Sequence, residues 1–336
     1  MKAAIQAITY YLPEQVLNNE QLALEYTGWT AKKIELKTGI QKRHIANQTE
    51  CASDLAVAAG LELFKNGFCA HDEVDYLLIC TQSPDYFLPT TACLVQERLG
   101  LRTGCGALDL NLGCSGFVYG LGLAKGLIET GQAGKVLLIT AETYSKHIHP
   151  GDKSVRTIFG DAAAATLLQA VESDHECIGP FVYGTDGRGA KNLIVPTGGL
   201  RSPFAVNAET TEDGNGNKRT TNNLYMNGPE IFNFTLRVVP ETVSKLLTIA
   251  EKRMEDIDLF IFHQANQYIL EHLKRKLKVP NEKMPIMMDH CGNTVSSTIP
   301  ILLKDLEMAG RLKKGLRLML LGFGVGYSWA GTLVHW

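Results

Sequence analysis

The chain has 336 residues, of which 45% are hydrophobic and 20% are charged, and its formal net charge at pH 7 is −2. This composition is typical of a globular protein with one large core or two fused cores, and it excludes a disordered chain. The nearly balanced charge argues against nucleic acid or an anionic membrane surface as a partner, because such partners are met by a local excess of Lys and Arg.

Eight cysteines are spread along the chain without a Cys-x-x-Cys pair. This spacing indicates neither a zinc ribbon nor a disulfide framework, so we expect reduced thiols and no metal. A metal site formed by His263, His290 and Cys291 is also disfavoured, because adjacent Cys and His residues lack workable ligand spacing. The N-terminus shows no signal peptide, and no run reaches the roughly 18 apolar residues of a membrane span. We therefore expect a cytoplasmic protein.

The first half of the chain alternates predicted strands and helices. Residues 41–44 are expected to form an exposed basic turn. The predicted helices cover residues 19–26, 32–36, 53–66 and 114–131, and a further predicted helix ends at residue 99. The predicted strands are one at the start of the chain, one that ends at residue 113, and those covering 74–81, 135–141 and 159–168. This alternation indicates parallel βαβ units in a sheet that is covered on both faces.

The sequence turns polar at residues 172–174, and we place the boundary between two halves there, 1–172 and 173–336. The second half repeats the same order of elements, which suggests an internal structural duplication. Its predicted helices cover 225–250, 264–277 and 297–308, and its predicted strands cover 258–263, 316–321 and 328–335. The long polar segment 201–223 is expected to be a surface excursion or a partly mobile lid.

Cys114 stands where a predicted strand gives way to a predicted helix. The first turn of a helix presents unpaired N–H groups and the positive end of the macrodipole, which favour a thiolate over a thiol. The small neighbours Gly113, Ser115 and Gly116 let a substrate approach the backbone closely. The alternative is that Cys114 is one more small residue of the core.

Two further polar residues stand at comparable points of the chain: His263 ends a predicted strand, and Asn293 follows Gly292 in a turn. Because loops at the carboxyl ends of parallel strands converge on one crevice, these residues and Cys114 can meet there. A cysteine with a histidine and an asparagine is a nucleophile with two N–H donors. Taken singly, His263 fits a hydrogen-bonded core histidine equally well, and Asn293 fits an ordinary turn residue.

Seven short motifs follow one another along the whole chain: Tyr11-Leu-Pro, Lys37-Thr-Gly-Ile, Cys114-Ser-Gly-Phe, Phe159-Gly-Asp, His263-Gln-Ala-Asn, Gly292-Asn-Thr and Gly322-Phe-Gly-Val-Gly-Tyr-Ser-Trp. Together they resemble the 3-oxoacyl-acyl-carrier-protein synthase III family of the thiolase superfamily. The resemblance implies an α/β fold of the thiolase type, with five layers (αβαβα) built from two similar halves, and a homodimer.

The resemblance also implies a decarboxylating Claisen condensation in two stages. Cys114 would take an acyl group from an acyl-CoA or an acyl-carrier protein, and malonyl-acyl-carrier protein would then lose carbon dioxide and attack the acyl-cysteine. His263 and Asn293 would donate hydrogen bonds to the enolate oxygen, and the backbone N–H groups of Cys114 and Val325 would form an oxyanion hole. No cofactor beyond these substrates is implied.

By the same resemblance, the substrate-binding residues are Lys33, Lys37, Leu88, Lys153, Gly228, Phe232 and Asn266, and Arg275 and Lys276 belong to a carrier-protein surface. Lys33 replaces a tryptophan that stacks on adenine in the family, and lysines also replace two arginines. Lysine keeps the charge but loses planar stacking, which indicates either weak binding of coenzyme A or a carrier-protein donor. Leu88 replaces a phenylalanine that the partner subunit inserts into the acyl pocket, which favours a longer or branched chain.

Two other functions remain compatible with the sequence. A same-fold acyltransferase would pass the acyl group to an oxygen or nitrogen nucleophile without decarboxylation. A non-catalytic subunit would instead pair with an active synthase, although such subunits commonly lose the nucleophile that this chain retains. The acyl chain length stays open, as does the choice between fatty acids and a specialised metabolite.

Overall fold

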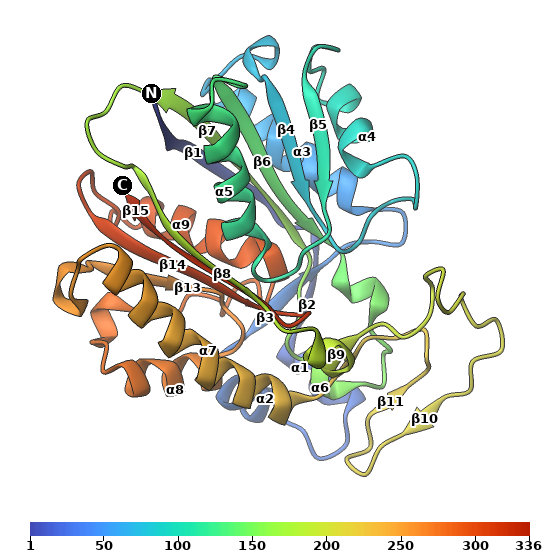
Figure 1. Ribbon diagram of the computed structural model, residues 1–336. Coiled ribbons are helices and arrows are strands. Elements are labelled where there is room, and N and C mark those ends of the chain that lie inside the picture. The colour runs from blue at the N-terminus through green and yellow to red at the C-terminus, as the bar shows by residue number, and fades with distance from the viewer.

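Two large β-sheets and three layers of helices form the body of the computed structural model, which describes residues 1–336 (Figure 1). The first sheet has the strand order β1 (Lys2–Tyr11), β7 (Ala162–Val171), β6 (Lys135–Glu142), β4 (Tyr76–Cys80) and β5 (Gly106–Leu110). The second sheet has the order β13 (Leu259–Phe262), β14 (Arg317–Gly324), β15 (Ser328–His335) and β8 (Ile178–Thr185). The apolar strands β4, β6 and β13 are buried, as their continuous hydrophobic runs predict.

The helices cover both faces of each sheet. The outer layer on the first sheet holds α3 (Ala52–Lys65) and α4 (Thr91–Arg98), and the outer layer on the second holds α7 (Gly228–Ile249) and α8 (Gln267–Leu277). The central layer holds α5 (Gly116–Glu129) and α9 (Thr298–Met308), whose apolar residues share one buried cluster with both sheets. The order is therefore αβαβα, and the expected five-layer α/β fold is confirmed.

The sheets also bear on the predicted division at residue 172. Every strand of the first sheet comes from residues before 172, and every strand of the second comes from residues after 173. We propose on this basis that the chain consists of the two halves 1–172 and 173–336.

Both sheets are mixed, which corrects the expectation of purely parallel units. Only the pairs β4–β5, β4–β6 and β13–β14 are parallel, and the other neighbours run antiparallel. A parallel pair needs a long crossover, usually a full helix. The link from β6 to β7 contains only the short helices η2 (Tyr144–His147) and α6 (Lys153–Arg156), and β14 and β15 are joined by a short turn. Strand β8 was not predicted.

Residues 42–44 belong to a strand rather than an exposed basic turn, and only Gln41 before it is an exposed bend. Lys42–Ile45 are strand β3, which pairs with β2 (Gln15–Asn18), and Arg43 is fully buried. Its guanidinium donates to the carbonyl oxygen of Leu17, to Oδ1 of Asn19 and to the carbonyl oxygen of Thr157. A buried cation needs such acceptors, and they come from segments that the local sequence does not reveal.

Two of the predicted helices begin later than expected because their first residues have other partners. Residues Tyr225–Met226 form strand β12, paired with β9 (Leu193–Ile194), and α7 is capped by the side chain of Asn227. Helix α8 is capped by the side chain of Asn266, whose Oδ1 accepts a hydrogen bond from the N–H of Ile269 at 2.9 Å. Both caps satisfy N–H groups at helix ends that face the same region.

The remaining elements lie beside these layers. Helices α1 (Asn19–Glu25) and α2 (Ala31–Thr38) confirm the two early predicted helices. The polar segment 201–223 is a surface excursion, as predicted, and includes the hairpin of β10 (Thr211–Glu212) and β11 (Lys218–Arg219) that projects from the molecule (Figure 1). Its role as a lid stays a prediction. None of the helices has the length and apolar character required to cross a membrane.

Candidate active site

Cys114 lies in the turn between β5 and α5, two residues before the first residue of the helix. The turn is closed by a hydrogen bond from the N–H of Gly116 to the carbonyl oxygen of Gly113 at 2.8 Å. The predicted junction of strand and helix is therefore present. The strand itself differs from the prediction, since β5 is an edge strand and only half-buried.

The glycine-rich end of β14 packs directly against this turn. A Cβ atom on Gly322 would lie 2.5 Å from the carbonyl oxygen of Cys114, and a Cβ on Gly324 would lie 2.9 Å from its Sγ atom. Only glycine permits such a close approach of two backbones. The sulfur is consequently placed by contact between a central helix and a strand of the second sheet.

His263 and Asn293 come to the same point from two other segments. His263 follows directly on β13, and its N–H donates to the carbonyl oxygen of Leu321 in β14 at 2.9 Å. Asn293 pairs with the segment around Phe159: its backbone N–H donates to the carbonyl oxygen of Ile158 at 2.9 Å, and its carbonyl oxygen accepts from the N–H of Gly160 at 3.0 Å. Its Nδ2 atom donates to the carbonyl oxygen of Ala265 at 3.2 Å, which ties the asparagine to the segment that carries the histidine.

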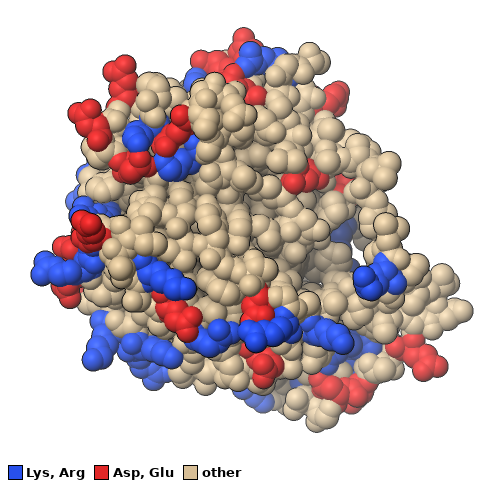
Figure 2. Space-filling view, viewed as in Figure 1, with Lys and Arg blue, Asp and Glu red and all other residues tan.

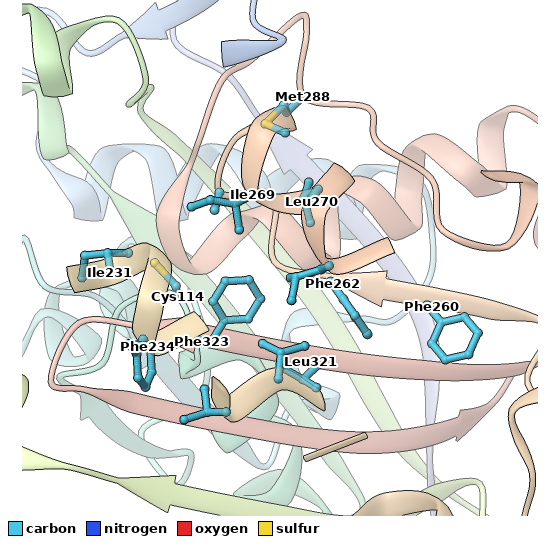
Figure 3. Packing of buried hydrophobic residues seen from close by; sticks show 14 of the residues in the cluster. Cys114, Ile231, Phe234, Phe260, Phe262, Ile269, Leu270, Met288, Leu321 and Phe323 are labelled. Atoms are coloured by element: carbon cyan, nitrogen blue, oxygen red, sulfur yellow. The ribbon is translucent and has the colours of Figure 1, made fainter. Parts of the chain in front are cut away.

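These three side chains line one cavity of about 80 Å³. Its mouth is at Gly228, which is exposed, and Asn266, which is half-buried. The cavity is otherwise mostly apolar, and Figure 3 shows Cys114 beside Phe323 and near Ile231. The full set of lining residues is Cys114, Ile158, Phe159, Leu193, Met226, Gly228, Ile231, His263, Ala265, Asn266, Ile269, Asn293, Phe323 and Gly324.

The Cys114 thiol is protonated at neutral pH, contrary to the expectation of a thiolate. Burial raises the pKa of Cys114 to about 12, and the negative charge of Glu142 adds to this shift. The backbone N–H groups of Cys114 and Val325 act in the opposite direction, because they hydrogen-bond the sulfur. The residues that bury the sulfur belong largely to the second half of the chain, so the local sequence around Cys114 does not reveal them.

His263 is the only other ionisable residue that lines the cavity, and burial lowers its pKa to about 3. The neutral ring places Nδ1 at 2.7 Å from the hydroxyl of Thr298. That hydroxyl donates to the carbonyl oxygen of Val295 at 3.1 Å, so its oxygen accepts the Nδ1 hydrogen. Nε2 then carries the lone pair. A neutral imidazole of this tautomer accepts a proton before it can donate one.

Glu142 is a member of the site that sequence reasoning missed. It ends β6, is fully buried, and accepts hydrogen bonds from the N–H of Gln82 at 3.1 Å and the hydroxyl of Ser296 at 2.8 Å. Burial raises the pKa of Glu142 to about 8. Ser296 follows Asn293 closely, so this carboxyl connects the asparagine loop to the first sheet. The available signal was an acidic residue directly after a continuous apolar run.

The predicted substrate-binding residues fall into two groups. Gly228 and Asn266 line the cavity at its mouth. Phe232 does not line it; its ring packs on α8, with its centroid 5.5 Å from that of Tyr268. Leu88 is 83% exposed in the loop before α4, and it lies outside the cavity of its own chain.

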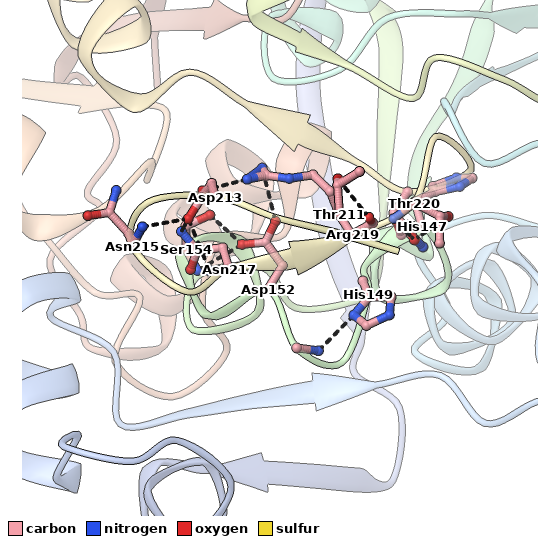
Figure 4. Close-up of polar contacts among 12 residues, drawn as sticks. His147, His149, Asp152, Ser154, Thr211, Asp213, Asn215, Asn217, Arg219 and Thr220 are labelled. Carbon is pink, nitrogen blue, oxygen red and sulfur yellow. Dashed lines mark hydrogen bonds and ion pairs between the residues drawn. The ribbon is translucent and has the colours of Figure 1, made fainter. Parts of the chain in front are cut away.

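The predicted lysines lie outside the cavity and have partners of their own. The Nζ atom of Lys33 lies 5.1 Å from the ring centroid of Trp29, and that of Lys37 lies 5.9 Å from the same ring. Lys153 donates to the carbonyl oxygen of Asn215 at 2.6 Å, in the turn of the β10–β11 hairpin. Figure 4 shows this hairpin turn, in which the Asp213 carboxylate accepts hydrogen bonds from the backbone N–H groups of Asn215 and Asn217.

Comparisons with known proteins identify the family of this chain. The family model "3-Oxoacyl-[acyl-carrier-protein (ACP)] synthase III" matches residues 108–187, and the model of the C-terminal part of the same family matches residues 247–336. The beta-ketoacyl-[acyl-carrier-protein] synthase III of Caldanaerobacter subterraneus subsp. tengcongensis is 36% identical over 99% of this chain and 98% of its own length. The chain belongs to the 3-oxoacyl-[acyl-carrier-protein] synthase III family.

Solved structures of the family superpose over the whole chain. A crystal structure of a 3-oxoacyl-(acyl-carrier-protein) synthase III has a TM-score of 0.99 at 55% identity and covers 100% of both chains. The 3-oxoacyl-(acyl-carrier protein) synthase of Burkholderia xenovorans LB400 has a TM-score of 0.90 at 37% identity, over 99% of this chain and 94% of that chain. Within the family, Cys114 falls in the first matched segment, and His263 and Asn293 fall in the second.

The contact between Thr298 and His263 leads to a first prediction. The variant Thr298→Val removes the hydroxyl that holds Nδ1–H, so we expect alkylation of Cys114 by iodoacetamide at neutral pH to slow about tenfold. Thr298→Ser keeps the hydroxyl and should restore the rate. Peptide mass spectrometry would follow Cys114, and thermal unfolding would verify the fold. Equal rates in both folded variants would show that the hydroxyl does not set the tautomer.

A second prediction concerns pH. Above about pH 8, Glu142 is ionised, and its charge disfavours the Cys114 thiolate. Glu142→Gln removes that charge, so the pKa of Cys114 should fall and alkylation at pH 9 should accelerate, by about tenfold for each pKa unit. The exposed Glu241→Gln is the matched control and should leave the rate unchanged. A slower reaction in a folded Glu142→Gln protein would contradict the electrostatic coupling.

Proposed function

We propose that the protein is a transferase that performs a decarboxylating Claisen condensation, giving a 3-oxoacyl thioester. The observation that carries this proposal is the meeting of Cys114, His263 and Asn293 in one mostly apolar cavity. Full-length similarity to enzymes named beta-ketoacyl-[acyl-carrier-protein] synthase III supports it. We further propose that the reaction serves fatty acid biosynthesis or a related pathway.

In the first stage, Sγ of Cys114 bonds to the carbonyl carbon of an acyl thioester, and the bond between that carbon and the donor sulfur breaks. The thiol proton passes to Nε2 of His263, the only base that lines the cavity, and from there to the departing thiolate. The backbone N–H groups of Cys114 and Val325, which hydrogen-bond the sulfur, would also stabilise the oxyanion. The products are an acyl-cysteine and a free thiol.

In the second stage, the carboxylate of a malonyl thioester leaves as carbon dioxide, and the electron pair of the broken bond forms an enolate. Asn293 uses one N–H toward Ala265, so its second N–H is available to the enolate oxygen. The enolate carbon then bonds to the carbonyl carbon of the acyl-cysteine, the bond from that carbon to Sγ breaks, and the Sγ thiolate takes up a proton from water. Donation from His263 to the same oxygen requires Nε2 to carry a hydrogen, and that role stays a prediction.

The partners that we propose are an acyl-CoA or acyl-carrier protein as donor and malonyl-acyl-carrier protein as the second substrate. Lys and Arg gather along the lower edge of the face shown in Figure 2, where α8 and α2 lie in Figure 1. Arg275 and Lys276 stand in the last turn of α8, and Lys33 and Lys37 stand on α2. This charge suits an acidic carrier and phosphate groups. The cytoplasmic location stays a prediction.

A third prediction tests the reaction itself. With an acyl thioester and malonyl-carrier protein labelled in the free carboxyl, the wild type should release labelled carbon dioxide and form an acyl-enzyme visible by intact mass. Asn293→Asp can still accept from the N–H of Val295 but cannot donate. We expect it to form acyl-enzyme normally while release of carbon dioxide falls about 10²–10³-fold.

Cys114→Ala should form no acyl-enzyme, whereas the exposed Cys93→Ser should behave as wild type. Acyl-enzyme without release of carbon dioxide, together with transfer to an amine or alcohol, would replace the condensation with the acyltransferase alternative. A Cys114 that takes no acyl group from any donor would favour a non-catalytic subunit.

We also propose that the protein is a homodimer. Strand β5 is an edge strand of the first sheet, and its Leu108 is 42% exposed. The adjoining loop exposes Tyr86, Phe87 and Leu88 at 61%, 79% and 83%. An uncovered edge beside an apolar loop is a template for pairing with a second chain, and a two-fold axis would place β5 against β5.

As a fourth prediction, the wild type should sediment at about twice the 36.9 kDa of one chain. Leu108→Lys would place like charges across the two-fold axis and shift the protein toward the monomer. Leu36→Lys, at a residue that is 73% exposed on α2, is the control and should leave the mass unchanged. A monomeric wild type at micromolar concentration would contradict the proposal.

A further inference from the structure

The residue before Asn293 is a glycine in a conformation that other residues avoid. Gly292 has a φ of +75°, and a Cβ atom there would lie 2.8 Å from the carbonyl oxygen of Ile158. Glycine is also the residue that leaves such a conformation most readily, so it gives no rigidity to the backbone that leads into Asn293. The turn 289–292 must therefore be held by contacts that its other residues make.

His290 makes the charged contact between this turn and α9. Its Nε2 atom lies 3.4 Å from Oδ2 of Asp305, a residue of α9 that is 7% exposed. The two groups form an ion pair when the imidazole is protonated. The other carboxylate oxygen, Oδ1, accepts a hydrogen bond from the hydroxyl of Tyr10 in β1 at 3.0 Å. Asp305 thus ties the turn to α9 and to the first sheet.

Oδ2 of Asp305 depends on His290 because it has no hydrogen-bond partner of its own. The atom is buried and accepts no hydrogen bond. Burial raises the pKa of Asp305, and His290 and the Tyr10 hydroxyl act in the opposite direction. Asp289 also faces the imidazole, with its Oδ1 atom 3.9 Å from Nδ1. A buried carboxylate needs a cation or a donor beside it, and at Oδ2 that group is the imidazole of His290.

Helix α9 thereby contacts both partners of Cys114. Its first residue, Thr298, holds Nδ1 of His263 at 2.7 Å. Asp305 stands seven residues later, which is about two helical turns, so the two side chains lie on the same face. This face holds the imidazole of His263 directly and reaches Asn293 through the turn that precedes it.

The hydrogen bond from Asn293 to an enolate is sensitive to the position of this turn. The Nδ2 atom of Asn293 is oriented by its hydrogen bond to Ala265, which at 3.2 Å is at the long end of the normal range. A displacement of about 1 Å in such a donor can lower a rate by up to about 10²-fold. The acylation of Cys114 relies on other donors, the N–H groups of Cys114 and Val325.

We propose that His290 and Asp305 are positioning residues for Asn293 in the condensation stage. This inference rests on the proposed function, in which Asn293 stabilises the enolate. Neither residue lines the cavity around Cys114, so both act through the turn 289–292 and not on the substrate. Loss of the pair frees the backbone to rotate at Gly292 and shifts Asn293, while the sulfur and its backbone donors stay in place. The pair therefore affects decarboxylation and leaves acylation unchanged.

The fifth prediction separates the two stages in variants of this pair. His290→Ala removes an imidazole that is 31% exposed, and Asp305→Asn removes the charge but can still accept from Tyr10. We expect both variants to form acyl-enzyme, timed by intact mass, within about twofold of the wild-type rate. Release of labelled carbon dioxide from malonyl-carrier protein should fall about tenfold. His290→Arg keeps a planar cation beside Asp305 and should restore the release.

A double variant and a matched control complete the experiment. Because the two residues act as a pair, His290→Ala/Asp305→Asn should lose no more than either single variant. Glu307→Gln removes an equal charge from the same helix, where Glu307 pairs with Lys304 at the surface, and it should leave both stages unchanged. Thermal unfolding would establish which proteins are native.

Three results would overturn the inference while the condensation stands: an equal fall in both stages, losses that multiply in the double variant, or native single variants that release carbon dioxide at the wild-type rate. A wild type that forms acyl-enzyme but releases no carbon dioxide would overturn the proposed function and this inference with it.

Discussion

The close packing of the β14 glycines against the Cys114 turn is the contact on which the rest of the site depends. Gly322 and Gly324 leave no room for a side chain between the strand and the sulfur. This close packing brings the N–H of Val325 to the sulfur. It also brings His263 to the site, because His263 follows β13 and β13 pairs with β14. The nucleophile and its partners come from different sheets, so the site exists only when the two sheets share their central layer of helices.

Neither Cys114 nor His263 carries a charge before substrate binds. The thiol of Cys114 is protonated and the ring of His263 is neutral, both because they are buried. Charge therefore develops only during the reaction, on the attacked carbonyl oxygen and on the enolate, where N–H donors stand ready and water is scarce. Such a site favours stabilisation of transient anions over storage of a reactive thiolate, and it keeps a long-lived sulfur anion away from oxidants.

Much of this arrangement could be predicted from the sequence, because it follows from local patterns. Apolar runs indicated the buried strands. Cys114 after one predicted strand, His263 at the end of another and Asn293 in a turn indicated three polar groups that could meet. The burial of Arg43 could not be predicted, since its acceptors belong to segments far along the chain. The pKa of Cys114 likewise depends on residues of the other half, and strand direction depends on connections whose path the sequence leaves open. Thr298 carries no signal of its own, because a threonine that begins a helix is ordinary.

The β10–β11 hairpin has a consequence for how this chain can change over evolutionary time. Asp152, which caps α6, is completely buried, and its Oδ2 atom lies 3.3 Å from a guanidinium nitrogen of Arg219 in the hairpin. Deleting the excursion would leave the buried carboxylate of Asp152 without its cationic partner. Breaking such a pair lowers the free energy of unfolding by about 3–5 kcal/mol. An insertion held by a buried ion pair is costly to delete, whatever function selected it at first. Descendants of this chain should therefore lengthen or substitute the hairpin more readily than lose it.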